Sequence, residues 1–228
     1  ALETATQALR SMVSSSDGVQ ETGDQIGDLH HFSNTLFNCM RGGLFHRDHE
    51  IPSADLRNFA EARCKALSDS QRQFFDDLAP ALSVTELSEK ARATDDPALR
   101  RWCLEYLPLR FGRRHGDPSR PWNQFSIKTQ DADGNPLLQY EGNWRDIFQN
   151  WEALSLSFPD FVEGMVARFV NASTFDGFNP ARITRDGIDW EVPDPEDPWS
   201  TIGYWGDHQV AYLWPLLEQS IRVHPGRL

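Results

Sequence analysis

The sequence is poor in cysteine, and the few cysteines show no pairing pattern. Only three occur among 228 residues, at Cys39, Cys64 and Cys103, and none belongs to a Cys-x-x-Cys element. An odd number without paired spacing argues against a disulfide framework and against a zinc ribbon. We therefore interpret all three as small buried hydrophobic residues in a reducing compartment, and we expect a cytoplasmic location.

Long apolar runs and an excess of positive charge are also missing. No stretch approaches the ~18 apolar residues of a membrane-spanning helix, and the N-terminus lacks the charged and apolar regions of a signal peptide. The net charge of −12 argues against non-specific binding to nucleic acid or to anionic lipid. The sequence starts at Ala1 without an initiator methionine, so we expect a processed chain or a piece of a longer one.

Metal-ligating residues are present but badly spaced for a metal site. The run His46-Arg47-Asp48-His49-Glu50 lies in a predicted loop and contains no His pair at i,i+4. The run Asp131-Ala132-Asp133-Gly134 lacks the terminal Glu of a calcium-binding loop. We expect neither a metal site nor a cofactor.

Most of the chain shows the periodicity of amphipathic helices. Nine segments have apolar residues at helical spacing, over residues 2–13, 28–40, 53–63, 71–78, 83–93, 97–106, 144–156, 160–171 and 203–221. Ser83 and Glu86 have the spacing of a capping box, and Pro97 suits a first helical position. Short helices joined by short polar loops predict helix packed on helix, an all-α fold of helical hairpins. A β-ribbon is expected over residues 182–191.

The segment of about 108–140 differs from the helices around it. We predict one mainly helical domain over residues 1–228, with this segment as a loop or hairpin insertion and a turn at Asp131-Ala132-Asp133-Gly134-Asn135-Pro136. Its cations lie close together at Arg110, Arg113, Arg114, His115 and Arg120. Arg113, Arg114 and His115 are candidate ligands for a phosphate or another anion. Salt bridging to the acidic residues elsewhere is the alternative.

Tryptophans beside charged residues mark the stretch from residue 141 to residue 209. It contains five of the eight tryptophans, almost every one beside a carboxylate, an arginine or a histidine. This combination suits a sugar site, because the indole face packs on pyranose C–H groups while the charged groups bind hydroxyls or move protons. Amphipathic packing at the surface of a helical domain is the alternative explanation.

One motif in this stretch resembles a known family. The run Gly142-Asn143-Trp144-Arg145-Asp146 is similar to the Gly-Asp-Trp-Asn-Asp element of cellobiose-phosphorylase-like glycosidases, with Asn143 in place of the first Asp and Arg145 in place of the Asn. More broadly, the helical pairs and aromatic-carboxylate loops look like the six-hairpin (α/α)6 toroid glycosidases, including the amylo-glucosidase-like branch. A complete toroid has about twelve helices, which need ~300 or more residues. The resemblance therefore implies part of a larger toroid enzyme, or a reduced version of one.

The resemblance implies that Asp146 is the general acid of an inverting glycoside hydrolase. The base would be a second carboxylate ~6.5–9.5 Å away. Its candidates are Asp189, Glu191 and Asp207, with Asp207 first because His208 beside it helps to set its ionisation. The remaining candidates bind an oligosaccharide or small glycoside: Trp144, Trp190 and Trp205 as a platform, and Arg182, Arg185, His208 and Gln209 on hydroxyls. If phosphate replaces water in a phosphorolytic reaction, the Arg113-Arg114-His115 segment is the expected phosphate site.

Two alternatives to a complete enzyme stay open. A non-catalytic helical module that binds a glycan or a protein would use the same residue types, because tryptophan and arginine also dominate protein interfaces. A structural part of a split enzyme would show an exposed apolar face and self-association, or would bind the remainder of a longer chain.

Overall fold

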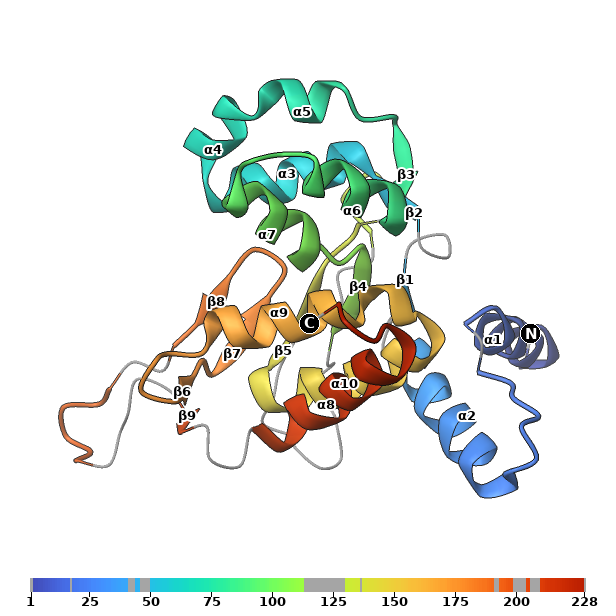
Figure 1. Cartoon of the computed structure of the whole chain (residues 1–228). Coiled ribbons are helices and arrows are strands. Elements are labelled where there is room, and N and C mark those ends of the chain that lie inside the picture. The colour runs from blue at the N-terminus through green and yellow to red at the C-terminus, as the bar shows by residue number, and fades with distance from the viewer. Residues whose placement is uncertain are drawn as a thin grey trace.

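The structure is a computed structural model that describes residues 2–16, 18–40, 44–45, 50–112, 130–135, 137–190, 193–198, 204–205 and 210–227. These residues form a mainly helical fold, which confirms the helical part of the predicted class (Figure 1). They also form three small sheets, one of five strands, where an all-α fold with one ribbon was predicted. None of the helices in these ranges is long and apolar enough to cross a membrane.

The helices and strands follow one another in a mixed order. The helices are α1 (Leu2–Ser15), α2 (Gln25–Met40), α3 (Ser53–Arg63), α4 (Lys65–Ser70), α5 (Arg72–Asp76), α6 (Val84–Arg92), α7 (Pro97–Glu105), α8 (Trp144–Ser157), the 3-10 helix η1 (Pro159–Phe161), α9 (Val162–Ala172) and α10 (Val210–Val223). The strands are β1 (Leu44–Phe45), β2 (Glu50–Pro52), β3 (Ala81–Ser83), β4 (Leu109–Gly112), β5 (Tyr140–Asn143), β6 (Phe178–Asn179), β7 (Arg182–Thr184), β8 (Ile188–Asp189) and β9 (Tyr204–Trp205).

Residues 50–106 form a helical unit with a hydrophobic core of its own, which we call the small unit. It comprises α3–α7 and the antiparallel pair β2–β3, and it occupies the top of Figure 1. Its helix starts confirm the predicted caps. The Ser83 hydroxyl accepts a hydrogen bond from the Glu86 backbone N–H, and the Glu86 carboxylate accepts one from the Ser83 N–H. Asp96 caps α7, with Pro97 in the first helical position.

The second core lies below it, in what we call the large unit, residues 107–112, 140–190 and 210–227. Helices α8, α9 and α10 pack on one another there, next to strands β5 and β7. Trp144, Phe148 and Trp151, at positions i, i+4 and i+7 of α8, are fully buried. Ring centroids lie 4.8 Å apart for Trp144 and Phe148, and 5.2 Å apart for Trp144 and Phe169. The aromatic face of α8 is therefore the centre of this core.

A five-stranded sheet in the order β1-β4-β5-β7-β8 runs beside the helices. Strands β4 and β5 are parallel, and the other neighbours are antiparallel. The ribbon predicted over residues 182–191 is confirmed over residues 182–189, as the β7–β8 hairpin. Strand β5 leads directly into α8, and the Trp144 N–H donates to the Ala181 carbonyl at 3.1 Å. The sheet thus fixes where α8 begins.

Several elements differ from the prediction. Helix α10 begins at Val210 rather than near residue 203, because Tyr204 and Trp205, two aromatic residues that suit a strand, pair with β6 as β9. Helix α2 begins at Gln25, since Asp24 accepts from the Gly27 N–H at 3.1 Å, while Asp28 binds Thr22. The predicted helical segment 71–78 is the shorter helix α5, and α4, between α3 and α5, was not predicted.

Residues 113–129 and 136 of the predicted insertion of about 108–140 lie outside the described residues, but its turn at Asp131 is confirmed. The Asp131 carboxylate accepts from the N–H groups of Asp133 at 2.9 Å and Asn135 at 2.8 Å. Gly134 has φ of 85°, a left-handed conformation that favours glycine.

The structure corrects the interpretation of one cysteine. Cys39 and Cys103 are buried as predicted, but Cys64, at the C-cap of α3, is exposed. Burial raises the pKa of the Cys103 thiol to about 12, and it also raises the pKa of Cys39. Because the thiolate is the reactive form, neither buried thiol is reactive near neutral pH.

We therefore expect native protein to react with one equivalent of a thiol reagent, at Cys64. The measurement is mass spectrometry of the intact protein after iodoacetamide treatment at pH 7.5. Cys64→Ser should abolish the native reaction, and all three thiols should react in denaturant. More than one adduct on the folded wild-type protein would contradict the assignment.

Candidate functional site

Several of the predicted site residues lie together at one end of strands β5, β7 and β8, which we call the sheet edge. Asn143, Arg182 and Asp189 are opposite one another across the three strands, so their side chains share one face of the sheet. The Arg182 Nε donates to Asp189 Oδ2 at 2.7 Å. Trp190, which follows Asp189, is half-buried. This edge therefore combines a cation, a carboxylate, an amide and an indole.

Asp146 lies beside this edge, in the first turn of α8. Its side chain is only 5% exposed, and Asn143 Nδ2 lies 3.4 Å from Asp146 Oδ2. Asn150, one turn further, donates from Nδ2 to the Asp146 backbone carbonyl at 2.8 Å. Asn143 thus connects Asp146 to the strand that carries Arg182 opposite it.

Two predicted ligands of the sugar lie elsewhere. Trp144 is fully buried, so its indole packs in the core of the large unit and offers no face to a ligand. Arg185 lies at the far end of the β7–β8 hairpin, where its Nη2 donates to the Asp55 carbonyl at 3.0 Å and lies 2.8 Å from Asp55 Oδ2. Arg185 therefore ties the hairpin to the small unit.

The other predicted site residues lie outside the described residues. These are Glu191, Asp207, His208 and Gln209, and the anion candidates Arg113, Arg114 and His115. Only the backbone is described for Trp205, which pairs with Phe178 across β9 and β6. Within the described ranges, no group of three or more His, Cys, Asp or Glu side chains is arranged to hold a metal ion.

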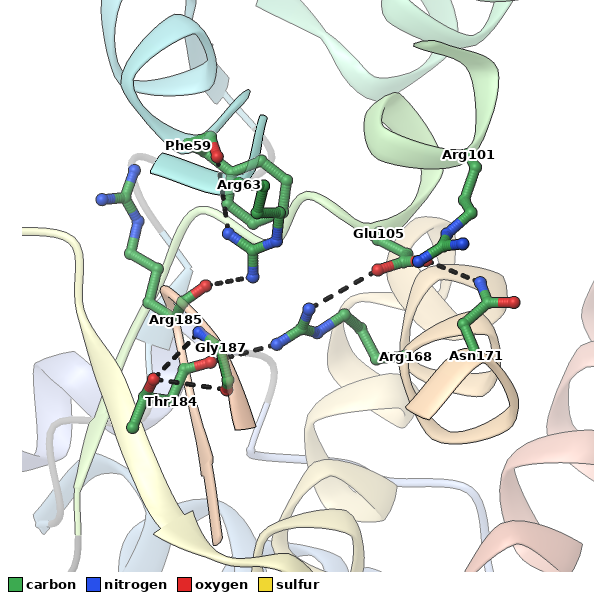
Figure 2. A network of polar contacts seen from close by, with 9 residues as sticks. All are labelled: Phe59, Arg63, Arg101, Glu105, Arg168, Asn171, Thr184, Arg185 and Gly187. Atoms are coloured by element: carbon green, nitrogen blue, oxygen red, sulfur yellow. Dashed lines mark hydrogen bonds and ion pairs between the residues drawn. The ribbon is translucent and has the colours of Figure 1, made fainter. Parts of the chain in front are cut away.

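A polar network that the sequence did not predict holds the β7–β8 hairpin in place (Figure 2). The Arg63 guanidinium, stacked on the Phe59 ring, donates to the backbone carbonyl of Arg185. From the large unit, Arg168 Nη2 donates to the Thr184 carbonyl at 3.0 Å. Partners up to 122 residues apart in the chain leave no signal in sequence spacing. The only hint was a charged residue on the apolar side of a predicted helix, as at Arg168.

Asp55 is the second connection between the hairpin and the small unit. Besides its contact with Arg185, its Oδ2 accepts a hydrogen bond from the Tyr106 hydroxyl at 2.5 Å. Burial, together with the adjacent Asp55 charge, raises the pKa of Tyr106 well above its usual value. Tyr106 therefore stays a neutral donor, and the hairpin is held to the small unit by partly buried contacts.

Comparison with known families finds a match to the small unit. A family model described as glycoside hydrolase family 149 insertion domain 1 matches residues 45–108. The small unit is similar to a glycoside hydrolase insertion domain. The matched segment contains the whole small unit with its separate core, and it ends where the predicted insertion of about 108–140 begins. The match supports a relation to glycoside hydrolases, which is the general part of the predicted resemblance. No curated protein matches the chain.

Proposed function

We propose that this chain takes part in the cleavage of glycosidic bonds, as a glycoside hydrolase with an inverting mechanism. The observation that supports the proposal most strongly is the match of residues 45–108 to a glycoside hydrolase insertion domain. The sheet edge with Asn143, Asp146, Arg182 and Asp189 follows it in the chain and contains two of the candidate carboxylates, Asp146 and Asp189. The helical pair α8–α9 and helix α10 would belong to an (α/α)6 toroid.

In this proposal Asp146 is the general acid. Its side chain is almost completely removed from solvent, so its proton would pass to the leaving oxygen without competition from bulk water. Asn143, 3.4 Å away, would hold the carboxyl group in position. Arg182 and Trp190 would contact the sugar next to it.

The base is proposed among Asp207, Glu191 and Asp189, in that order. Asp189 comes last because Arg182 already binds its carboxylate, both through Nε at 2.7 Å and through Nη2. A carboxylate in an ion pair is a weaker proton acceptor than a free one. Cytoplasmic location is part of the proposal, since an exposed free thiol at Cys64 suits a reducing compartment.

The proposal is tested by a substrate screen on the purified protein. Panels of α- and β-linked disaccharides and glucans are incubated with and without inorganic phosphate, and released sugar is quantified. We expect turnover by the wild-type protein and its loss in Asp146→Asn, by roughly 100-fold or more. Asp207→Asn should lose turnover if water is the nucleophile, whereas dependence on phosphate would identify phosphorolysis.

Asp95→Asn is the matched control, because it removes an exposed carboxylate from the small unit, away from the sheet edge. It should retain wild-type turnover. If Asp146→Asn cleaves every substrate as fast as Asp95→Asn does, Asp146 is not the acid.

A non-catalytic role is the second candidate, and one observation favours it. The matched family is described as an insertion domain of a glycoside hydrolase, and not as its catalytic domain. The small unit would then bind a glycan or a neighbouring domain. Absence of turnover, together with sugar binding that survives Asp146→Asn, would establish this alternative.

A further inference from the structure

A polar cavity lies between the small unit and the β7–β8 hairpin. Its volume is about 300 Å³, and its polar lining comes from Arg63, Arg101, Glu105, Arg168, Asn171 and Asp186. A volume of this size is at the lower end of the roughly 300–1,000 Å³ typical of small-molecule sites. The cavity is at the Arg185 end of the hairpin, whereas Asp146 and Asp189 are at the other end. It is therefore distinct from the sheet edge.

The lining carries more positive than negative charge, although the whole chain has a net charge of −12. Three guanidinium groups, those of Arg63, Arg101 and Arg168, face two carboxylates, those of Glu105 and Asp186. Glu105 is already shared, since it accepts from Arg101 Nε at 2.7 Å and from Asn171 Nδ2 at 2.6 Å, and pairs with Arg168 at 3.5 Å. One positive charge in the cavity thus lacks a matching anion among these residues.

Arg168 is the most buried of the three guanidinium groups, and its hydrogen bonding is incomplete. Its side chain is only 7% exposed, and its Nη1 and Nη2 atoms bind Glu105 and the Thr184 carbonyl (Figure 2). Its Nε is buried and has no hydrogen-bond partner among the described residues. A buried donor without a partner is costly, so Glu105 and Thr184 do not fully satisfy the Arg168 guanidinium.

Arg63 adds a second desolvated cation. Its guanidinium stacks 3.7 Å over the Phe59 ring and reaches into the same cavity. Burial lowers the pKa of Arg63 to about 10, and the nearby charge of Arg168 acts in the same direction. An anion between the two guanidinium groups would relieve their repulsion.

We propose that this cavity binds the oxyanion group of a small ligand through Arg63, Arg101 and Arg168. Guanidinium groups bind carboxylate, sulfate and phosphate through pairs of parallel hydrogen bonds, and burial such as that of Arg168 strengthens them. Asn171 supplies an amide beside the charges, and Asp186 is at the rim as an exposed carboxylate.

Binding is measured by isothermal titration calorimetry at constant ionic strength, with chloride as the background anion. Sulfate, inorganic phosphate, glucuronate and uncharged glucose are the four probes. We expect saturable binding of at least one oxyanion at one site per chain, and none of glucose. Binding of sulfate and phosphate alone identifies a tetrahedral anion, and binding of glucuronate alone identifies a carboxylate. Absence of binding by all three anions overturns the proposal.

Variants that each change one charge test where the anion binds and whether positive charge in the lining attracts it. Arg101→Gln, at an exposed position of the lining, should weaken binding by roughly 2- to 5-fold, and Asp186→Asn should strengthen it by a similar factor. Arg63→Gln, at a more buried position, should weaken binding by roughly 10-fold. Its melting temperature without anion verifies that it is folded.

Arg72→Gln is the control for net charge, since Arg72 is an exposed arginine of the small unit that pairs with Asp69 away from the cavity. It should bind like the wild-type protein. Equal weakening in Arg72→Gln and Arg101→Gln would show that the anions bind to the overall charge, and it would overturn the proposed site.

Discussion

Glu105→Ala is expected to lower the free energy of unfolding by about 3–5 kcal/mol, because it leaves the buried Arg168 charge without its anion. The Glu105 side chain is 4% exposed and accepts from Arg101 and Asn171 besides pairing with Arg168. Removal of one partner of a buried ion pair costs more than the pair itself contributes, since the remaining charge stays desolvated. Urea denaturation followed by tryptophan fluorescence measures the change.

The double variant Glu105→Leu/Arg168→Met separates the unpaired charge from the loss of packing. Removing both charges together should recover most of the lost stability, because no ion is left buried. Glu89→Ala, at an exposed position of α6, should change stability by about 0.5 kcal/mol or less. A double variant as unstable as Glu105→Ala would mean that the charge of Arg168 is not the cause.

Gly164→Ala is expected to destabilise the protein by about 1–3 kcal/mol, although alanine is normally the better helix former. Gly164 lies in α9, and a Cβ there would meet the Leu104 backbone carbonyl oxygen at 2.4 Å. The backbone of α7 cannot move aside in the way that the end of a flexible side chain can. The two units would therefore have to separate at this contact. Urea denaturation again measures the change.

Gly187→Ala is the matched control for this prediction. Gly187 is in the turn of the β7–β8 hairpin, has no left-handed φ, and has open space where the Cβ would be placed. Its substitution should change stability by about 0.5 kcal/mol or less. If Gly164→Ala stabilises the protein instead, the close approach of α9 to the Leu104 carbonyl does not exist in solution.

These contacts describe how a unit similar to an insertion domain is joined to the rest of the chain. Gly164 permits the backbone approach between α7 and α9, and Glu105 pairs with Arg168 at the same junction. The β7–β8 hairpin reaches from this junction to the Asp146 edge. A ligand in the arginine-lined cavity would therefore contact the same hairpin that carries Arg182 and Asp189.

Local patterns were sufficient to predict many of the elements. The aromatic spacing of Trp144, Phe148 and Trp151 predicts α8, and Ser83 with Glu86 predicts the start of α6. The turn at Asp131 and the β7–β8 hairpin were predicted from short runs as well. These features depend on hydrogen bonds and periodicities within a few residues, which are visible in any single sequence.

Tertiary structure alone decided what each side chain faces. The sequence places Trp144 on the apolar side of α8, but it does not show that the indole is fully buried, in contact with Phe169 of α9. Likewise, nothing in the spacing indicated that Glu105 and Arg168, 63 residues apart, form a buried pair, or that Cys64 is exposed. Periodicity reports which side of an element is apolar, whereas burial depends on the distant segments that pack against it, and those contacts have no local signature.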